Sequence, residues 1–372
     1  MHLDRSQKLP LALHISLGHR VALGFGTKLV ELIHHYAFRI RTFAIRGAPP
    51  ETLFTLFVKA MPVLEELFIE AKPSTEYIDD SSSMLFLPSM IDGHLRRVDI
   101  RNTSTWRFSL RGLNRALLTD LRLSQAVSMK VTWAFLKQCI SLERLHWTTS
   151  TTDSWTPKTT LHLPSLKTLI LQGKITSYSQ AIRAANLRNL SITHIASDEP
   201  PKISTSPHLR TAIINAPSLS LPVLDDFVLR HPCLESLALM YMGHDGQKKS
   251  KWAWDVAALP ASVLSRTLTH HLPLRHLYLT SYDVNYPLLL SATPHMDTGL
   301  VNAIKRIVTE HTGIAGRLRD DMFEVFLVCG DEPGHPQWEK AKDLATEFDK
   351  TVKMESHGNF IKAFKELLQE DD

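Results

Sequence analysis

The sequence predicts an α/β fold in which short parallel strands, joined by helices, form a curved sheet. A six-residue apolar pattern recurs along the chain, about once every two dozen residues. The segments between its copies have the spacing of helices, and prolines precede several copies. Leucine accounts for 50 of the first 300 residues but only 5 of the last 72. The repeated part is therefore expected to end before the chain does.

The first strand is expected within residues 9–17, LPLALHISL. This run follows Lys8, as in a secretory signal, but it is short, contains His14 and lacks a small-residue cleavage site. No stretch of the chain reaches the roughly 18 to 20 apolar residues of a membrane-spanning helix. We interpret the run as a strand and expect no membrane association.

The repeated pattern has the form L-x-x-L-x-L. Its fourth and sixth positions alternate as in a strand with one buried face. Successive copies lie 24, 31, 23, 24, 24, 21, 22, 25 and 40 residues apart, and most of these steps fall within the roughly 20 to 29 residues of a leucine-rich repeat. The ten copies begin at Ile40, Leu64, Leu95, Leu118, Leu142, Leu166, Leu187, Leu209, Leu234 and Leu274.

Helices are expected between the copies, because apolar residues recur there every three to four positions. A proline then ends the helix, since its ring fixes φ and removes an N–H. One repeat cannot bury its apolar face alone, so stacked repeats should form a solenoid with the helices outside. The predicted helices are Thr52–Met61, Thr132–Cys139, Leu224–His231 and Ala261–His271, and the predicted exposed insertions are Pro73–Ser83 and Gly243–Lys251.

The residues between the apolar positions should meet laterally at about 4.8 Å on the other face of the sheet. Opposite charges fall side by side in this register. These rows form either a ladder of ion pairs, each contributing about 0 to 1 kcal/mol, or a surface for a partner. The rows are Thr42, Glu66, Arg97, Asp120 and Arg144 at position three, Asp99 and Arg122 at position five, and Arg46, Glu70 and Arg101 at position seven.

The change in composition divides the chain into a repeat array of about ten to eleven irregular repeats, residues 1–294, and a small C-terminal α/β segment, residues 295–372. Residues 301–372 carry 10 Lys and Arg against 15 Asp and Glu. A solenoid needs a cap with a polar outer face, so this acidic segment is either a cap or a docking surface. Its predicted elements are helices Thr298–His311, Gln337–Asp349 and Asn359–Leu368 and a strand, Met322–Val328.

Catalytic and metal-binding motifs are absent from the sequence. It contains no nucleophile elbow, zinc helix or phosphate loop, and we expect no enzyme, no cofactor and no metal. Cys139, Cys233 and Cys329 lie too far apart for a disulfide framework, which favours the cytoplasm or the nucleus. Cys139 and Cys233 precede copies of the pattern and are expected in the core, whereas the turn residues Asp331 and Glu332 should be solvated.

Basic residues are spread rather than clustered. Residues 1–300 carry 32 Lys and Arg against 23 Asp and Glu, and nucleic-acid binding usually requires a basic face. Lys248, Lys249 and Lys251, near Trp252 and Trp254, form either a solvated loop or a phosphate-binding insertion. We expect a protein partner rather than nucleic acid.

The prolines ahead of the copies, the irregular steps and the opening LPLALHISLGHR, followed by HHYAFRIRTFAIRG, resemble the leucine-rich-repeat portion of fungal F-box proteins, of basidiomycete type. The resemblance covers about residues 9–290. It implies the substrate-recognition part of a Skp-cullin-type ubiquitin ligase, in which the F-box holds the Skp adaptor and the repeats hold the protein to be ubiquitinated. An F-box should precede the first repeat, and Met1–Pro10 leave no room for it. We therefore expect the Skp adaptor only if an F-box exists upstream.

The leading hypothesis is a protein-binding module whose concave sheet holds a protein substrate. The alternative is a stand-alone scaffold without a link to ubiquitin, and a third class is an enzyme within the C-terminal segment. Aromatic residues, Met and Arg often anchor interfaces. The predicted partner-binding residues are Phe68, Arg101, Arg122, Arg144, His146, Met240 and Tyr278.

Overall fold

The computed structural model places a strand at each copy of the six-residue pattern. The described residues are 9–17, 23–48, 61–71, 84–86, 94–101, 107–109, 114–124, 129–149, 155–193, 206–215, 227, 230–241, 274–281, 301, 304–305, 308–309, 324–329, 336–348, 350–356, 359–360 and 362. Within them, residues 23–27, 84–86 and 107–109 and several single residues of other strands and helices are described by their backbone alone.

The prediction of one strand per copy is confirmed. Nine of the ten strands begin at the third position of the copy, and β2 begins at the first. The expected strand ahead of them is β1 (Leu11–Ser16). The ten are β2 (Ile40–Ala48), β3 (Glu66–Ala71), β5 (Arg97–Arg101), β7 (Asp120–Ser124), β8 (Arg144–Thr148), β10 (Thr168–Gln172), β12 (Asn189–Thr193), β13 (Thr211–Asn215), β14 (Ser236–Tyr241) and β15 (His276–Ser281).

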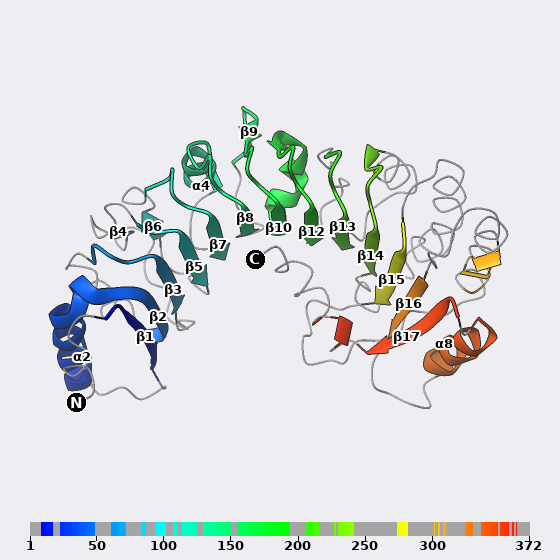
Figure 1. Ribbon diagram of the computed structural model, residues 1–372, viewed down its shortest axis with the longest axis horizontal. Coiled ribbons are helices and arrows are strands. Elements are labelled where there is room, and N and C mark those ends of the chain that lie inside the picture. Colours follow the sequence, from blue (N-terminus) through cyan, green and yellow to red (C-terminus); the bar gives the residue numbers. More distant parts are fainter. Residues whose placement is uncertain are drawn as a thin grey trace. The chain divides into compact units, whose positions relative to one another are not determined.

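The chain divides into two compact units. The first unit contains residues 1–166 and 181–184, and the second contains residues 167–180 and 185–372. In the first unit, β1, β2, β3, β5, β7 and β8 lie side by side in chain order and are parallel (Figure 1). In the second, β10, β12, β13, β14 and β15 follow the same rule. The main sheet is thus a parallel sheet of the α/β class.

Pairing in the first unit agrees with the register predicted from the charges. Glu66 lies opposite Arg97, and Arg97 lies opposite Asp120. At position five Asp99 is paired with Arg122, and at position seven Glu70 is paired with Arg101. A slip of one residue would exchange the two faces of the strands, so this agreement fixes which side chains face outward.

The fourth and sixth positions form the core, because successive residues of a strand point to opposite faces. In β7, Leu121 and Leu123 are at most 1% exposed, whereas Asp120, Arg122 and Ser124 are half-buried. Behind β8, the ring of Trp133 lies 6.1 Å from that of Trp147. Trp133 belongs to helix α4 (Met129–Leu136), which buries Met129, Thr132, Trp133 and Leu136 on one face.

Helices between the strands are fewer than predicted in the described residues. Helix α4 replaces the predicted Thr132–Cys139, starting three residues earlier and ending in a tighter turn, where the Cys139 N–H donates to the Leu136 carbonyl. Between β10 and β12 the chain forms a 3-10 helix, η2 (Gly173–Ala181), in place of an α-helix. A 3-10 helix rises about 2.0 Å per residue, compared with about 1.5 Å in an α-helix, so it spans a given distance with fewer residues, which suits the short 21-residue step between these two copies.

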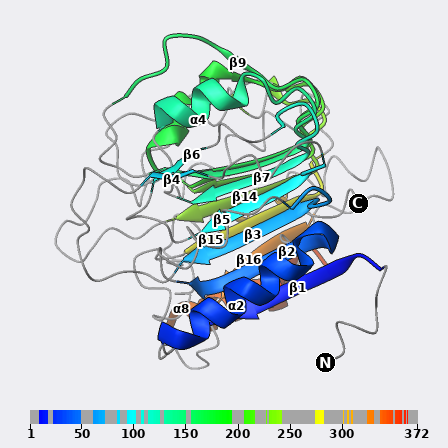
Figure 2. The ribbon, with the colours of Figure 1, turned by 90° about the vertical axis from the view of Figure 1, so that its left-hand side faces the viewer.

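The other described elements of the first unit were not predicted. Helix α2 (Leu23–Tyr36) and the 3-10 helix η1 (Ala37–Arg39) connect β1 to β2, and α2 runs beside these strands (Figure 2). Two small parallel sheets join β4 (Met84–Phe86) to β6 (Arg107–Ser109) and β9 (Leu161–His162) to β11 (Ile182–Arg183).

A glycine allows the close approach of β1 and β2. Gly47 has a φ of +71°, and a Cβ atom there would lie 2.5 Å from the Leu17 carbonyl oxygen. The Leu17 N–H donates to the Arg46 carbonyl at 2.9 Å. Only glycine fits this backbone without strain.

The C-terminal segment extends the parallel sheet of the second unit. Strand β16 (Glu324–Cys329), which confirms the strand predicted at Met322–Val328, pairs with β15. Helix α8 (Pro336–Glu347) occupies the predicted Gln337–Asp349, and a strand that was not predicted, β17 (Val352–Ser356), pairs with β16. The change of composition at residue 295 therefore lies within the second unit.

Several predicted segments lie wholly or mainly outside the described residues. Phe227 and Arg230 are helical within the predicted Leu224–His231, as are Val301, Ile304 and Val308 within Thr298–His311, and Asn359 and Phe360 within Asn359–Leu368. The segments outside are Thr52–Ala60 of the first helix, the helix Ala261–His271, both insertions, the lysine and tryptophan cluster at 248–254, and the turn with Asp331 and Glu332.

Candidate functional site

The candidate site is the face of the sheet that carries positions three, five and seven, which we call the open face. In the first unit its described side chains form three rows across β2, β3, β5, β7 and β8. These side chains are half-buried or exposed, while the inner-face positions are buried. The open face of this unit is therefore within reach of another molecule.

The row at position three is a chain of ion pairs. Arg97 lies 3.5 Å from both Glu66 and Asp120, and the Arg144 Nε donates to Asp120 at 3.0 Å. Burial raises the pKa of Asp120, and the nearby Arg144 and Arg97 oppose this rise. The charges in this row are paired with one another.

The rows at positions five and seven are joined by a bidentate pair. The Arg101 guanidinium donates three hydrogen bonds to Asp99, at 2.9, 3.0 and 2.5 Å. These bonds raise the pKa of Arg101, and both oxygens of Asp99 are engaged. Arg46 pairs with Glu70 at 3.6 Å.

Phe68 lies between two of these arginines. Its ring centroid is 5.1 Å from the Arg46 guanidinium carbon and 4.9 Å from that of Arg101. Both distances are within the range of cation–π attraction. The ring is held in place by charged neighbours and remains half-buried on the open face.

Arg122 has the loosest ion pairing of the arginines in these rows. Its Nε lies 3.9 Å from Asp99, whose oxygens bind Arg101. That Nε is buried and has no hydrogen-bond partner among the described residues. Burial lowers the pKa of Arg122, and Asp99 only partly opposes the effect. A buried N–H without a partner is costly, and the nearest carboxylate, that of Asp99, is 3.9 Å from this Nε.

The structure brings together five of the seven predicted contact residues. Phe68, Arg101, Arg122 and Arg144 lie on adjacent strands of the first unit, and His146 on β8 is paired with Arg122. Met240 and Tyr278 lie in the second unit, on β14 and β15. The Met240 side chain is outside the described residues, and Tyr278 is only 9% exposed.

The open face of the second unit has a different chemistry. Tyr278 stacks on Phe326 of β16 with centroids 4.6 Å apart, and the ring of Phe360 covers Tyr278 at 5.6 Å. Sequence reasoning missed both phenylalanines as members of this face. Residues 325–328 of β16 are all apolar, so the pattern does not show on which face Phe326 lies, and Phe360 reaches the sheet from outside the repeated pattern.

A histidine and a carboxylate flank this aromatic group. His276 Nδ1 is 3.2 Å from the Ser236 hydroxyl, and its Nε2 is 3.9 Å from Glu324, which also pairs with Lys353. Burial lowers the pKa of His276, and Glu324 partly opposes this shift. Neither residue was singled out in the sequence.

The described residues contain no cluster of metal ligands, and Cys139 and Cys233 differ in exposure. No group of three or more His, Cys, Asp or Glu among them could hold a metal ion. Cys139 is buried, as expected, and burial raises its pKa to about 12. The expectation that Cys233 lies in the core was wrong: it is exposed, because it falls in the turn between His231 and Leu234, which are themselves buried. No helix of the described part is long and apolar enough to cross a membrane.

The chain was compared with protein-family models and with curated proteins. No family model matches it, and no curated protein matches it.

Proposed function

We propose that this chain is a leucine-rich-repeat solenoid that binds another protein on the open face of its sheet, as the substrate-recognition part of a Skp-cullin-type ubiquitin ligase does. One parallel strand per repeat, at steps mostly of 21 to 25 residues, supports the repeat assignment. The role needs neither a cofactor nor a catalytic residue. The proposed compartment is the cytoplasm or the nucleus, and residues 295–372 are proposed to cap the array.

The observation that carries the proposal is the loose ion pairing of Arg122, which lies two strands from Phe68 on the same face of the first unit. Arg97, Arg101 and Arg144 already have carboxylate partners within 3.5 Å, whereas the Arg122 Nε has none within hydrogen-bond distance in the described part. A guanidinium binds carboxylates through paired N–H donors. The proposed partner therefore presents an acidic side chain to Arg122 and an apolar group to Phe68.

The test is affinity capture of binding proteins from the organism's own extract with Arg122→Met and its matched control Arg210→Met. Methionine keeps an unbranched apolar chain but removes the donors. Arg210 is exposed at a strand entry and pairs with Glu235 at 4.0 Å, so it serves as an arginine away from the open face. We expect Arg122→Met to lower retention of the partner by about tenfold, which corresponds to about 1.4 kcal/mol. Equal retention by both variants would contradict the proposal.

The same capture separates the ligase from a stand-alone scaffold. Recovery of the Skp adaptor with the full-length protein is the result expected of a ligase subunit. Recovery of an Arg122-dependent partner without the adaptor would assign the open face to a scaffold instead.

A further inference from the structure

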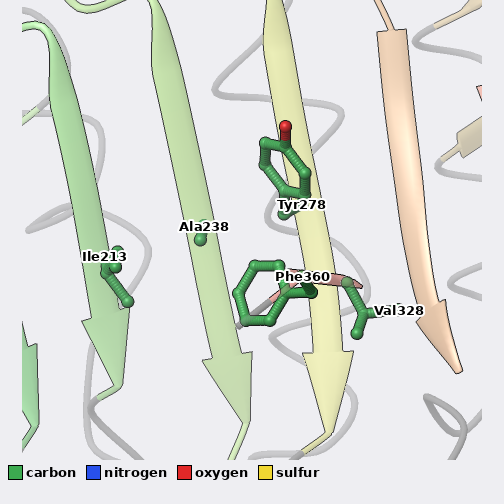
Figure 3. Close-up of a cluster of buried hydrophobic side chains, with 5 residues drawn as sticks. All are labelled: Ile213, Ala238, Tyr278, Val328 and Phe360. Atoms are coloured by element: carbon green, nitrogen blue, oxygen red, sulfur yellow. The ribbon is translucent and has the colours of Figure 1, made fainter. Parts of the chain in front are cut away.

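Four apolar side chains on the open face of the second unit belong to its core. They form an apolar patch that the ring of Phe360 covers (Figure 3). Each of the four is at most 9% exposed, and they are Ile213, Ala238, Tyr278 and Val328. The patch is therefore filled from within the chain.

Exposed apolar side chains gather instead in the first unit, in the turns that lead into its strands. Among the described residues, six large apolar side chains are at least 39% exposed. Five of them lie one or two residues before β1 or before a copy of the repeated pattern, and the sixth is Val131 on α4. We call these five the entry row. They are Leu9, Phe38, Val63, Leu117 and Ile140.

The main chain sets the turns of the entry row side by side. The Arg96 N–H donates to the Glu65 carbonyl at 2.8 Å, and the Thr119 N–H donates to the Arg96 carbonyl at 2.9 Å. At the start of the sheet, the Arg39 guanidinium donates to the Leu9 carbonyl at 3.2 and 3.0 Å. Neighbouring strands lie about 4.8 Å apart, so the row follows one edge of the sheet.

Cations accompany the apolar side chains at this edge. Arg96 and Lys137 are exposed, and neither forms an ion pair within the described part of the chain. Arg115 donates to the amide oxygen of Gln138 and lies over the ring of Phe135 at 5.6 Å, so its charge is also not matched by a carboxylate in these contacts. The edge therefore carries positive charge that an acidic partner can neutralise.

The carboxylates of the same turns do not cancel this charge. Glu65 is half-buried and bound to Arg41 at 2.8 Å, and Glu143 is half-buried as well. The described turns thus carry four exposed or half-buried cations and two carboxylates. The cations are Arg41, Arg96, Arg115 and Lys137.

The corresponding turns of the second unit have a different composition. Asn186, His208 and Cys233 stand immediately before the copies that contain β12, β13 and β14. Single exposed apolar residues are common on protein surfaces. Their alignment along one edge of one unit, beside unpaired cations, is what distinguishes the entry row.

The spacing of the row matches an α-helix laid across the strands. A helix advances about 5.4 Å per turn, close to the 4.8 Å between strands, and an amphipathic helix presents an apolar side chain on one face at nearly every turn. The six strands from β1 to β8 are separated by five spacings, or about 24 Å, which corresponds to a helix of about 16 residues.

We propose that the entry row binds an acidic amphipathic helix of a partner protein. The apolar stripe of the helix lies along the five side chains of the row, and its flanking carboxylates face Arg96, Arg115 and Lys137. This surface is an edge of the sheet rather than its open face, so the inference goes beyond the proposed function and does not depend on it.

The test uses the full chain and a synthetic peptide of about 16 residues, stapled into a helix and labelled with fluorescein. The peptide has leucine at every third or fourth position and glutamate on the flanking positions, and a second peptide has lysine in place of each glutamate. We expect fluorescence anisotropy to show at least about tenfold tighter binding of the acidic peptide. Equal binding of the two peptides, or no binding of the acidic one, would overturn the proposal.

Variants of the protein locate the binding. Leu117→Gln combined with Ile140→Gln should weaken binding of the acidic peptide about tenfold. Val131→Gln, at an exposed apolar position outside the row, is the matched control and should bind as the wild type does. Arg96→Glu combined with Lys137→Glu should reverse the preference between the two peptides. Circular dichroism shows that each variant is folded, and wild-type binding by both folded double variants would exclude the entry row.

An apolar row with cations could also bind an anionic membrane. Sedimentation with vesicles of phosphatidylserine and phosphatidylcholine tests this, and we expect the protein to stay in the supernatant. Sedimentation that the Leu117 and Ile140 substitutions abolish would assign the row to a membrane surface and overturn the helix. The Arg122 capture reports on the open face, so a failure here leaves that result unaffected.

Discussion

The inner faces of the two units are alike, whereas their open faces differ. On the inner side, Leu145 of the first unit and Leu237 of the second occupy the same position of the pattern, and each is 1% exposed. On the open side, position five of β5, β7 and β8 in the first unit holds Asp99, Arg122 and His146, whereas position five of β13, β14 and β15 in the second holds Ile213, Ala238 and Tyr278. The repeat thus constrains half of each strand and leaves the other half free for function.

The physical reason is the two-residue period of a strand. Side chains at inner positions pack into the hydrophobic core of their unit. A side chain at an open position contacts only its neighbours on adjacent strands and any group that covers the open face. In the first unit the lateral neighbours satisfy one another by ion pairing, and in the second unit a distant side chain, Phe360, covers them.

The largest predicted difference comes from placing a charge at position five of each unit. Ala238→Asp buries a carboxylate without a cation in the apolar patch, and we expect it to lower the free energy of unfolding by about 3 to 5 kcal/mol. Ala44→Asp, at the matching position of β2, is half-buried beside charged rows and should change it by less than about 0.5 kcal/mol. Chemical denaturation followed by circular dichroism gives both values. Similar losses for the two variants would mean that the open faces do not differ.

Removal of a leucine from the inner face should lower the free energy of unfolding by a similar amount in the two units. Leu145→Ala and Leu237→Ala each remove a fully buried side chain, and each should cost about 2 to 5 kcal/mol through lost transfer energy and the cavity left behind. The same denaturation experiment compares them. A small cost for only one of them would show that its inner face is not closely packed.

The ion pairs of the first unit should contribute little to the free energy of unfolding. A double-mutant cycle with Arg144→Met and Asp120→Asn should give a coupling of about 0.2 to 1 kcal/mol, because both side chains contact solvent. High salt should reduce this value. A coupling of several kcal/mol would indicate that the row stabilises the sheet rather than forming a surface.

The smallest predicted effect is a change in the free energy of unfolding with pH. Burial holds the pKa of His276 below its ordinary 6.5, so the unfolded chain binds the proton more readily than the folded one. The free energy of unfolding should therefore fall as the pH decreases through about 6.5. Thermal unfolding between pH 8 and pH 5 measures this slope for the wild type and for His276→Gln. The variant should show the shallower slope, and identical slopes would exclude His276 as the source.

The strands and their register could be predicted from the sequence because both depend on local alternation. Arg97 between Glu66 and Asp120 reveals the pairing of three strands without any structure. Strand β17 was not predicted, although Val352 and Met354 alternate with Lys353 and Glu355, because two apolar positions outside the repeated pattern are too few to distinguish a strand from a loop. The strand has only one neighbour in the described sheet. Edge strands carry such charges as protection against aggregation.

Features that depend on contacts across the fold were also missed. The apolar face of the predicted helix Asn359–Leu368 includes Phe360, but nothing in that pattern indicates the strands on which the ring lies. Likewise, Arg122 is incompletely paired because Asp99 accepts its close hydrogen bonds from Arg101. The sequence does not indicate which of these two arginines Asp99 contacts.

Gly47 sets a limit on how this molecule can vary. Neighbouring residues such as Arg46 project outward and can be exchanged without moving the main chain, so the open face can acquire new chemistry by single substitutions. At Gly47 any side chain would collide with the Leu17 carbonyl oxygen, and the first two strands would have to separate. A saturation mutagenesis scan of this strand should find that Gly47 tolerates no substitution, whereas the neighbouring Arg46 tolerates many. The main chain itself thus restricts which residues can occur at position 47.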